Sequence, residues 1–157
     1  MRTFTIKNYK SLSSGAFTAT LYRDNKRIAL IEDDGHGGAP RLHLLAESGK
    51  LPETREDVRA LWEREAEVVA EMDEWAKVTV PDWYLSNWGE WDDPLTANWE
   101  LGIGYLTEVL EFVKLAKKGT LLRNPEGQFL TTRTVGAPPP TNFKGWVWVD
   151  GTWKPVG

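Results

Sequence analysis

The 157-residue chain contains no cysteine, which excludes a disulfide framework and metal sites built on thiolates. It has no apolar run of the ~18 residues that a membrane-spanning helix needs, and its N-terminus lacks the apolar stretch of a signal peptide. It also has no G-x-S-x-G nucleophile elbow, and its glycine-rich stretch lacks the Lys-Ser/Thr of a P-loop. We therefore expect a cytoplasmic protein that does not contact membranes.

The residues that are present favour a folded chain with an uneven charge. Hydrophobic residues make up 41% of the sequence and charged residues 27%, enough to build a core. Residues 53–100 carry fourteen acids and four bases, a net charge of −10, whereas the rest of the chain has a net charge of +6. The acidic middle would repel nucleic acid and attract a basic partner, unless it is simply the solvated face of a helix.

Alternation of apolar and polar residues predicts an antiparallel sheet in the first third of the chain. Residues 16–22 and 27–32 flank the tetrapeptide 23–26, in which Asp24 and Asn25 tolerate left-handed backbone, so we expect a β-hairpin. Further strands are predicted at residues 3–9 and 39–45.

Two helices are predicted after this sheet. The first covers residues 54–77, begins at a Thr54 cap, and has apolar residues at helical spacing: Val58, Leu61, Trp62, Ala66, Val69, Met72 and Ala76. The second covers about residues 95–118, with Asp93 before Pro94 as its N-cap. Residues 82–94 between them are predicted to be a loop because Gly89 and Pro94 interrupt any period.

The C-terminal part predicts two more hairpins. Residues 120–132 turn at Asn124 to Gly127, and we expect this hairpin to join the N-terminal sheet in one domain at 1–132. A proline-rich linker at 133–144 leads to a tryptophan-rich hairpin at 145–157. Two strands alone are marginally stable, so Trp146, Trp148 and Trp153 should be buried against the body or a second copy, which allows a homo-oligomer.

These elements together predict an α+β fold. A small antiparallel sheet packs against two helices, whose aliphatic stripes face it, and a tryptophan-rich β-hairpin forms the C-terminal tail.

The order of motifs also resembles a known family. FTATLYRDNKRIALIEDDGHGG is followed by an acidic helix and then by WELGIGYLTEVLEFVKLAKKGTLLRNPEGQF. This order resembles a family of small bacteriophage and prophage proteins that pair an x-A-x-L-Y-x-D-G-K hairpin with a D-G-H-G-G loop. The resemblance covers residues 16–132; Asn25 replaces the usual turn glycine, and the tail is not covered. It implies a phage accessory protein and transfers no catalytic residue.

The stretch EDDGHGGAP contains the residues with the most chemical potential, and four interpretations compete. As a turn, its glycines adopt positive φ while Asp33 or Asp34 caps loop amides. This interpretation explains the histidine poorly. As a binding loop for a nucleotide or phosphate, the backbone amides would face the anion, and the residues involved would be Asp33, Asp34, Gly35, His36, Gly37 and Gly38.

The other two interpretations use the imidazoles. Asp33 and Asp34 with His36 and His43 could hold zinc or manganese. Alternatively, His36 could act as a general base that a neighbouring aspartate orients, although no nucleophile is evident. We expect no cofactor.

For function, the sequence favours a non-enzymatic protein that binds a host protein, such as a defence or replication component. The expected contact residues are the acidic helix face, Glu63, Glu67 and Glu71, and the aromatic cluster Trp83, Trp88 and Trp91. Such large aromatics are equally suited to anchoring a loop or core. A small-molecule or metal-binding protein that uses residues 33–38 is the alternative.

Overall fold

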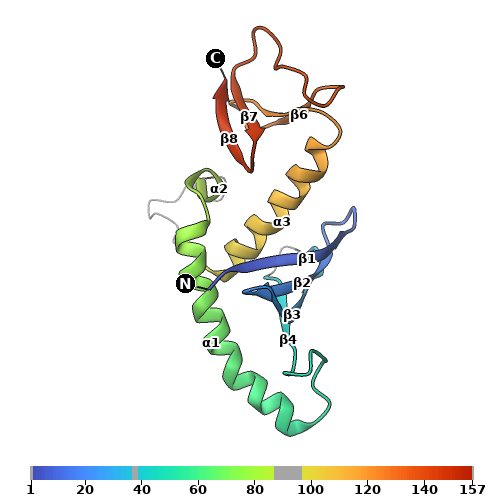
Figure 1. Cartoon of the computed structure of the whole chain (residues 1–157), viewed down its shortest axis with the longest axis vertical. Coiled ribbons are helices and arrows are strands. Elements are labelled where there is room, and N and C mark those ends of the chain that lie inside the picture. The colour runs from blue at the N-terminus through green and yellow to red at the C-terminus, as the bar shows by residue number, and fades with distance from the viewer. Residues whose placement is uncertain (1, 37–38, 87–96, 157) are drawn as a thin grey trace. The chain divides into compact units, whose positions relative to one another are not determined.

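The computed structural model of the chain describes residues 2–36, 39–86 and 97–156 (Figure 1). The chain forms two compact units, Met1–Leu106 and Thr107–Gly157, and α3 (Trp99–Ala116) runs from the first into the second. Antiparallel sheets and helices together confirm the predicted α+β class. The units divide at Leu106, whereas the sequence had suggested a domain at 1–132.

The sheet of the first unit is antiparallel with the order β1-β2-β3-β4. Its strands are β1 (Phe4–Ser11), β2 (Phe17–Arg23), β3 (Lys26–Asp33) and β4 (Arg41–Leu44), close to the predicted ranges. The ladder Ile6–Leu21–Ala29–Leu44 crosses all four strands, and each of these side chains is buried. Alternate residues of a strand share a face, so this ladder forms the inner surface of the sheet.

The β2–β3 connection is the predicted two-residue hairpin turn. Arg23 pairs with Lys26, and the two residues between them, Asp24 and Asn25, have φ angles of 50° and 67°. Positive φ at both positions is the type I′ geometry that suits the twist of a hairpin. Asn25 therefore adopts the conformation that a glycine would otherwise supply.

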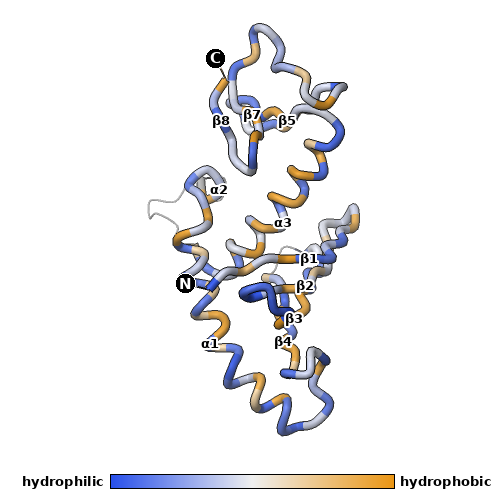
Figure 2. Tube along the Cα trace, viewed as in Figure 1, coloured by the Kyte–Doolittle hydropathy of each residue, from blue (hydrophilic) through white to orange (hydrophobic). Residues whose placement is uncertain are grey.

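Helix α1 (Arg55–Thr79) packs against this sheet: the Trp75 ring centroid lies 5.6 Å from that of Phe4 in β1, and Glu71 contacts Arg23 of β2. The Thr54 side chain accepts a hydrogen bond from the Asp57 amide, which confirms the predicted cap. Figure 2 shows hydrophobic residues recurring between hydrophilic ones along the helix. The buried face differs from the predicted stripe: it consists of Leu61, Val68, Met72, Trp75 and Ala76, whereas Trp62 is 70% exposed. The prediction that Trp62 faces the sheet was wrong.

The segment predicted as a loop at 82–94 begins with a short helix, α2 (Asp82–Ser86). Residues 87–96 lie outside the described ranges, and so does the predicted Asp93–Pro94 cap. Helix α3 begins at Trp99. Its first amides are satisfied by side chains, because Trp99 N–H donates to Asp73 of α1 (2.7 Å) and Leu101 N–H donates to Asn98 (3.0 Å). These bonds fix the start of α3 against α1.

The second unit contains the rest of α3 and a sheet of order β6-β5-β7-β8. Its strands are β5 (Leu121–Arg123), β6 (Phe129–Thr131), β7 (Gly145–Val149) and β8 (Thr152–Val156). The expectation that the 120–132 hairpin joins the N-terminal sheet was wrong. That hairpin pairs with the C-terminal hairpin through β5 and β7, because two isolated hairpins gain stability by sharing one sheet.

The core of the second unit is aromatic. Phe112 of α3 lies 5.1 Å from Trp148 and 5.3 Å from Trp153, measured between ring centroids. Both tryptophans are buried, and the Arg123 guanidinium lies 4.6 Å from the Trp146 ring. Of the three tryptophans predicted to be buried, Trp148 and Trp153 are buried within the chain's own second unit, whereas Trp146 is half-buried.

Candidate functional site

The glycine loop is built as a tight turn. Asp33 accepts a hydrogen bond from the Gly35 amide (2.7 Å), and Asp34 accepts one from the His36 amide (3.0 Å). Gly35 has φ +78°, and a Cβ there would lie 2.7 Å from the Ala16 nitrogen. The backbone therefore requires glycine at this point, as the turn interpretation predicts.

The same bonds bear on the phosphate hypothesis. Two amides that would face an anion donate to Asp33 and Asp34 instead, and the His36 amide lowers the pKa of the Asp34 carboxyl below its ordinary value. These carboxylates would repel a phosphate. Gly37 and Gly38, the remaining members of the predicted loop, lie outside the described residues.

The two histidines have separate local partners. The His36 side chain is 85% exposed with Nδ1 3.4 Å from Asp34, and His43 Nε2 lies 3.3 Å from Glu32 on the neighbouring strand. Across residues 2–36, 39–86 and 97–156, no three histidine or carboxylate side chains lie close enough to hold a metal ion. Among these residues, the metal hypothesis therefore has no preformed ligand set.

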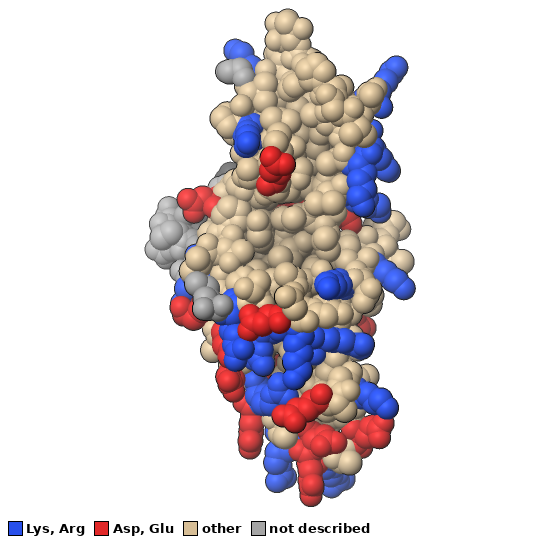
Figure 3. Space-filling view, in the orientation of Figure 1, with Lys and Arg blue, Asp and Glu red and all other residues tan. Residues whose placement is uncertain are grey.

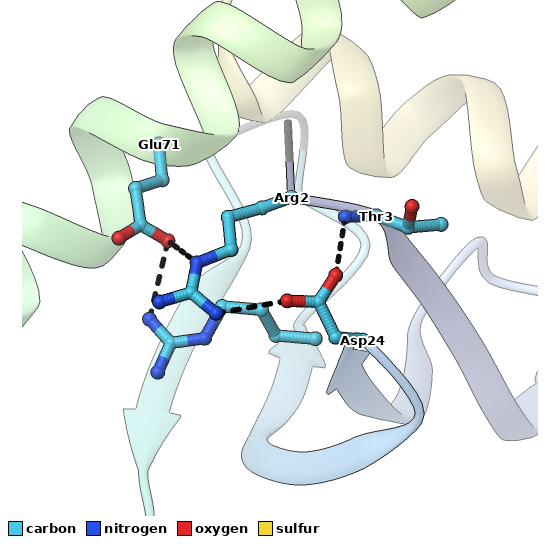
Figure 4. Close-up of polar contacts among 5 residues, drawn as sticks. Arg2, Thr3, Asp24 and Glu71 are labelled. Carbon is cyan, nitrogen blue, oxygen red and sulfur yellow. Dashed lines mark hydrogen bonds and ion pairs between the residues drawn. The ribbon is translucent and has the colours of Figure 1, made fainter.

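Glu71, predicted as a partner contact, is part of an internal ion-pair network (Figure 4). Its Oε2 lies 3.2 Å from Arg23 Nη1 and 3.4 Å from Arg2 Nε. Arg2 also contacts Asp24, whose pKa is lowered by the hydrogen bond from Arg2 and by the Thr3 amide. The network links α1 to the first hairpin, so Glu71 serves the fold.

Glu63 and Glu67 remain on the exposed face of α1, as predicted. Figure 3 shows acidic and basic side chains interleaved over α1 and the N-terminal sheet. The bases nearest in sequence are Arg59 and Arg64. Acidic and basic side chains therefore alternate on this face and do not form one continuous acidic patch.

Trp83, the described member of the predicted aromatic cluster, packs within the first unit. Its ring centroid lies 6.1 Å from that of Tyr84 and 6.0 Å from that of Tyr105. The side chain is half-buried, so it anchors α2 against the start of α3. Trp88 and Trp91 fall outside the described residues.

Among the described residues, Trp62 is the most exposed tryptophan and has a hollow beside it, although helical spacing had predicted it to lie in the core. Trp62 (70% exposed) and Leu51 (52% exposed) line a groove of about 340 Å³. We call this the Trp62 groove; its remaining walls are Leu42, His43, Leu44, Pro52, Val58, Leu61 and Glu65. A second hollow shares Pro52, Val58 and Trp62 with it.

Local structure explains how the groove forms. After β4 the chain turns back through an Ala46 N–H to Lys50 C=O hydrogen bond (2.8 Å), which brings Leu51 to the sheet edge. Helix α1 then starts at Arg55, and four of its five buried residues lie from Val68 onward. Its first turns carry Val58 and Trp62 on the adjoining face, which nothing else in the described chain covers.

The signal for this site was present in the sequence but ambiguous. Trp62 follows Leu61, and neighbouring helical residues are separated by about 100° around the axis, so only one of them can be central to the buried face. Leu61 has that role, at 7% exposure. Helical spacing alone does not decide whether the buried face of the helix is centred on Leu61 or on Trp62.

Comparisons with models of protein families, with curated proteins and with solved structures found no match to this chain. Within the described ranges, no helix combines the length and apolar character needed to cross a bilayer.

Proposed function

We propose that this chain is a non-enzymatic protein that binds another protein through the Trp62 groove. The observation that carries the proposal is the 70% exposure of Trp62 beside a groove lined by Leu51, Leu42 and Val58. Exposed tryptophan is costly in water and is enriched at the centres of protein interfaces, where it supplies much of the binding energy. Covering this groove with a partner would remove both exposed apolar side chains from water.

The resemblance of residues 16–132 to bacteriophage proteins extends the proposal to the partner's origin. We infer a phage accessory protein whose target is a host protein, such as a defence or replication component. The acidic excess of residues 53–100 supports a partner with basic character. The exposed Glu63 and Glu67 would contribute to association at low salt more than to final affinity.

The test uses immobilised full-length chain and extract of host cells. Wild type, Trp62→Ala and Val78→Ala are compared; Val78 is a matched control because it lies on the same helix and is also 70% exposed. A host protein retained by wild type and Val78→Ala, and lost from Trp62→Ala, supports the proposal. The captured protein is then purified, and its direct binding is measured by calorimetry with the same three chains.

Two results would contradict the proposal. One is a captured host protein that binds all three chains equally, which would place its site elsewhere. The other is the absence of direct binding between the purified components.

A further inference from the structure

The outer edge of β4 has unpaired backbone groups beside the Trp62 groove. Leu45 N–H donates to Ile28 C=O (2.8 Å), which marks one hydrogen-bonded pair of the β3–β4 ladder. In an antiparallel ladder such pairs alternate, so Arg41 and His43 direct their N–H and C=O groups toward β3. Leu42 and Leu44 direct theirs away from β3, and within the described chain these groups have no hydrogen-bond partner.

The chain itself begins to pair with this edge but stops. Ala46 bonds to Lys50, and the returning segment continues through Leu51 to Pro52. Proline has no amide proton and cannot donate to a ladder, so the returning segment does not continue along β4. The Trp62 groove is lined by three consecutive residues of β4, whose side chains alternate between faces, so it lies along the edge of the strand.

The opposite edge of the sheet is protected. Strand β1 has a bulge between Lys7 and Lys10, with Asn8 at φ 55°, and bulges and lysines are features that prevent edge pairing. Between Leu42 and Leu44, β4 has neither a bulge nor a lysine. The two edges of one sheet thus differ in whether they can accept another strand.

We propose that an extended segment of the partner adds to β4 as a fifth strand of this sheet. This inference rests on the proposed function and specifies its binding mode. The segment's backbone bonds with Leu42 and Leu44, and apolar side chains at alternate positions contact Trp62, Leu51 and Val58. A strand is recognised through its backbone, so the partner's first requirements are an extended conformation and alternating apolar residues.

Charge selects among possible occupants. Glu65 lines the groove and forms no ion pair within the described chain, and residues 47–67 carry seven acids and four bases, a net charge of −3. A partner strand with lysine or arginine beside its apolar residues complements this wall. A second copy pairing β4 with β4 would bring two such negative segments together, which disfavours self-association.

The experiment uses the full-length chain to select from a cell-surface library of random twelve-residue peptides. Selected sequences should alternate apolar residues and contain lysine or arginine. The strongest binder is then synthesised with single N-methyl groups along its backbone. N-methylation at alternate amides should weaken binding by about tenfold, the loss of one hydrogen bond, while methylation at the intervening amides has little effect.

A variant of the chain supplies the second arm. Leu42→Pro removes an outward N–H without removing a bond to β3, whereas Leu42→Val keeps that N–H and serves as the control. Leu42→Pro should weaken peptide and host-partner binding at least tenfold relative to Leu42→Val. Circular dichroism and melting temperature show whether both variants remain folded; if Leu42→Pro does not fold, the N-methyl pattern alone decides.

The outcomes separate the two proposals. If binding depends on Trp62 but not on alternate peptide amides, strand addition is wrong and the proposed function stands. Three results of the peptide selection would also contradict strand addition to a partner. They are selection of no peptide, selection of peptides whose apolar residues recur at helical spacing, and selection of the chain's own 41–44 segment. If replacing Trp62 leaves binding unchanged in both assays, both proposals are wrong.

Discussion

Replacing Glu71 with glutamine should destabilise the first unit because it breaks the link between α1 and the first hairpin. Glu71 and Arg23 are 23% and 16% exposed, and their side chains lie 3.2 Å apart. A hydrogen bond between charged groups contributes about 1.5–3 kcal/mol when buried. The contact is partly solvated, and the half-exposed Arg2 adds little, so we expect a loss of about 1–2 kcal/mol.

The assay is urea unfolding followed by circular dichroism at the helix band. Glu67→Gln is the matched control, since Glu67 is exposed four residues away on the same helix; its effect should stay within about 0.5 kcal/mol. A double-mutant cycle with Arg23→Gln should give a coupling of about 1 kcal/mol. Equal effects of Glu71→Gln and Glu67→Gln, or zero coupling, would refute the reasoning.

Because Glu71 stabilises the fold, it is unsuitable for a charge-reversal test of binding through the acidic face of α1. Reversing Glu71 would place a third positive charge beside Arg2 and Arg23, so lost binding could reflect lost folding. Reversing only Glu63 and Glu67 should leave the melting temperature nearly unchanged. A decrease in host-partner affinity in that double variant would then report on the acidic face itself.

Three further predictions concern the turn at Asp33 to His36, stability at low pH, and the C-terminal tail. Gly35→Ala should cost about 1–3 kcal/mol in unfolding free energy, because φ is +78° and the new Cβ meets the Ala16 backbone, whereas His36→Ala should stay within about 0.5 kcal/mol. Asp24 has a folded pKa below its ordinary 3.8, so its stabilisation is complete above that pH and is lost as pH falls through the folded pKa; Asp24→Asn should flatten this part of an acid titration of stability. Deleting residues 137–157 removes β7 and β8 and exposes Phe112, so the melting temperature should fall, and an unchanged melting curve would contradict the aromatic core.

The candidate site was only partly predictable. The turn at Asp33 to His36 could be inferred because its bonds join residues two positions apart. The sequence could not show that Glu71 pairs with Arg2 and Arg23, because these arginines are 69 and 48 positions away from it. The sequence did not predict the Trp62 groove, because helical spacing is consistent with either Leu61 or Trp62 as the buried residue.

By itself, the sequence determined the α+β class, the approximate strands and helices, the Asp24–Asn25 turn and the Thr54 cap. These features depend on propensities and hydrogen bonds among residues a few positions apart. Only the tertiary structure decided that the 120–132 hairpin pairs with the tail, which face of α1 is buried, and that the edge of β4 stays open. Each depends on which distant segments pack together, and many pairings of similar local strength compete until a shared core selects one.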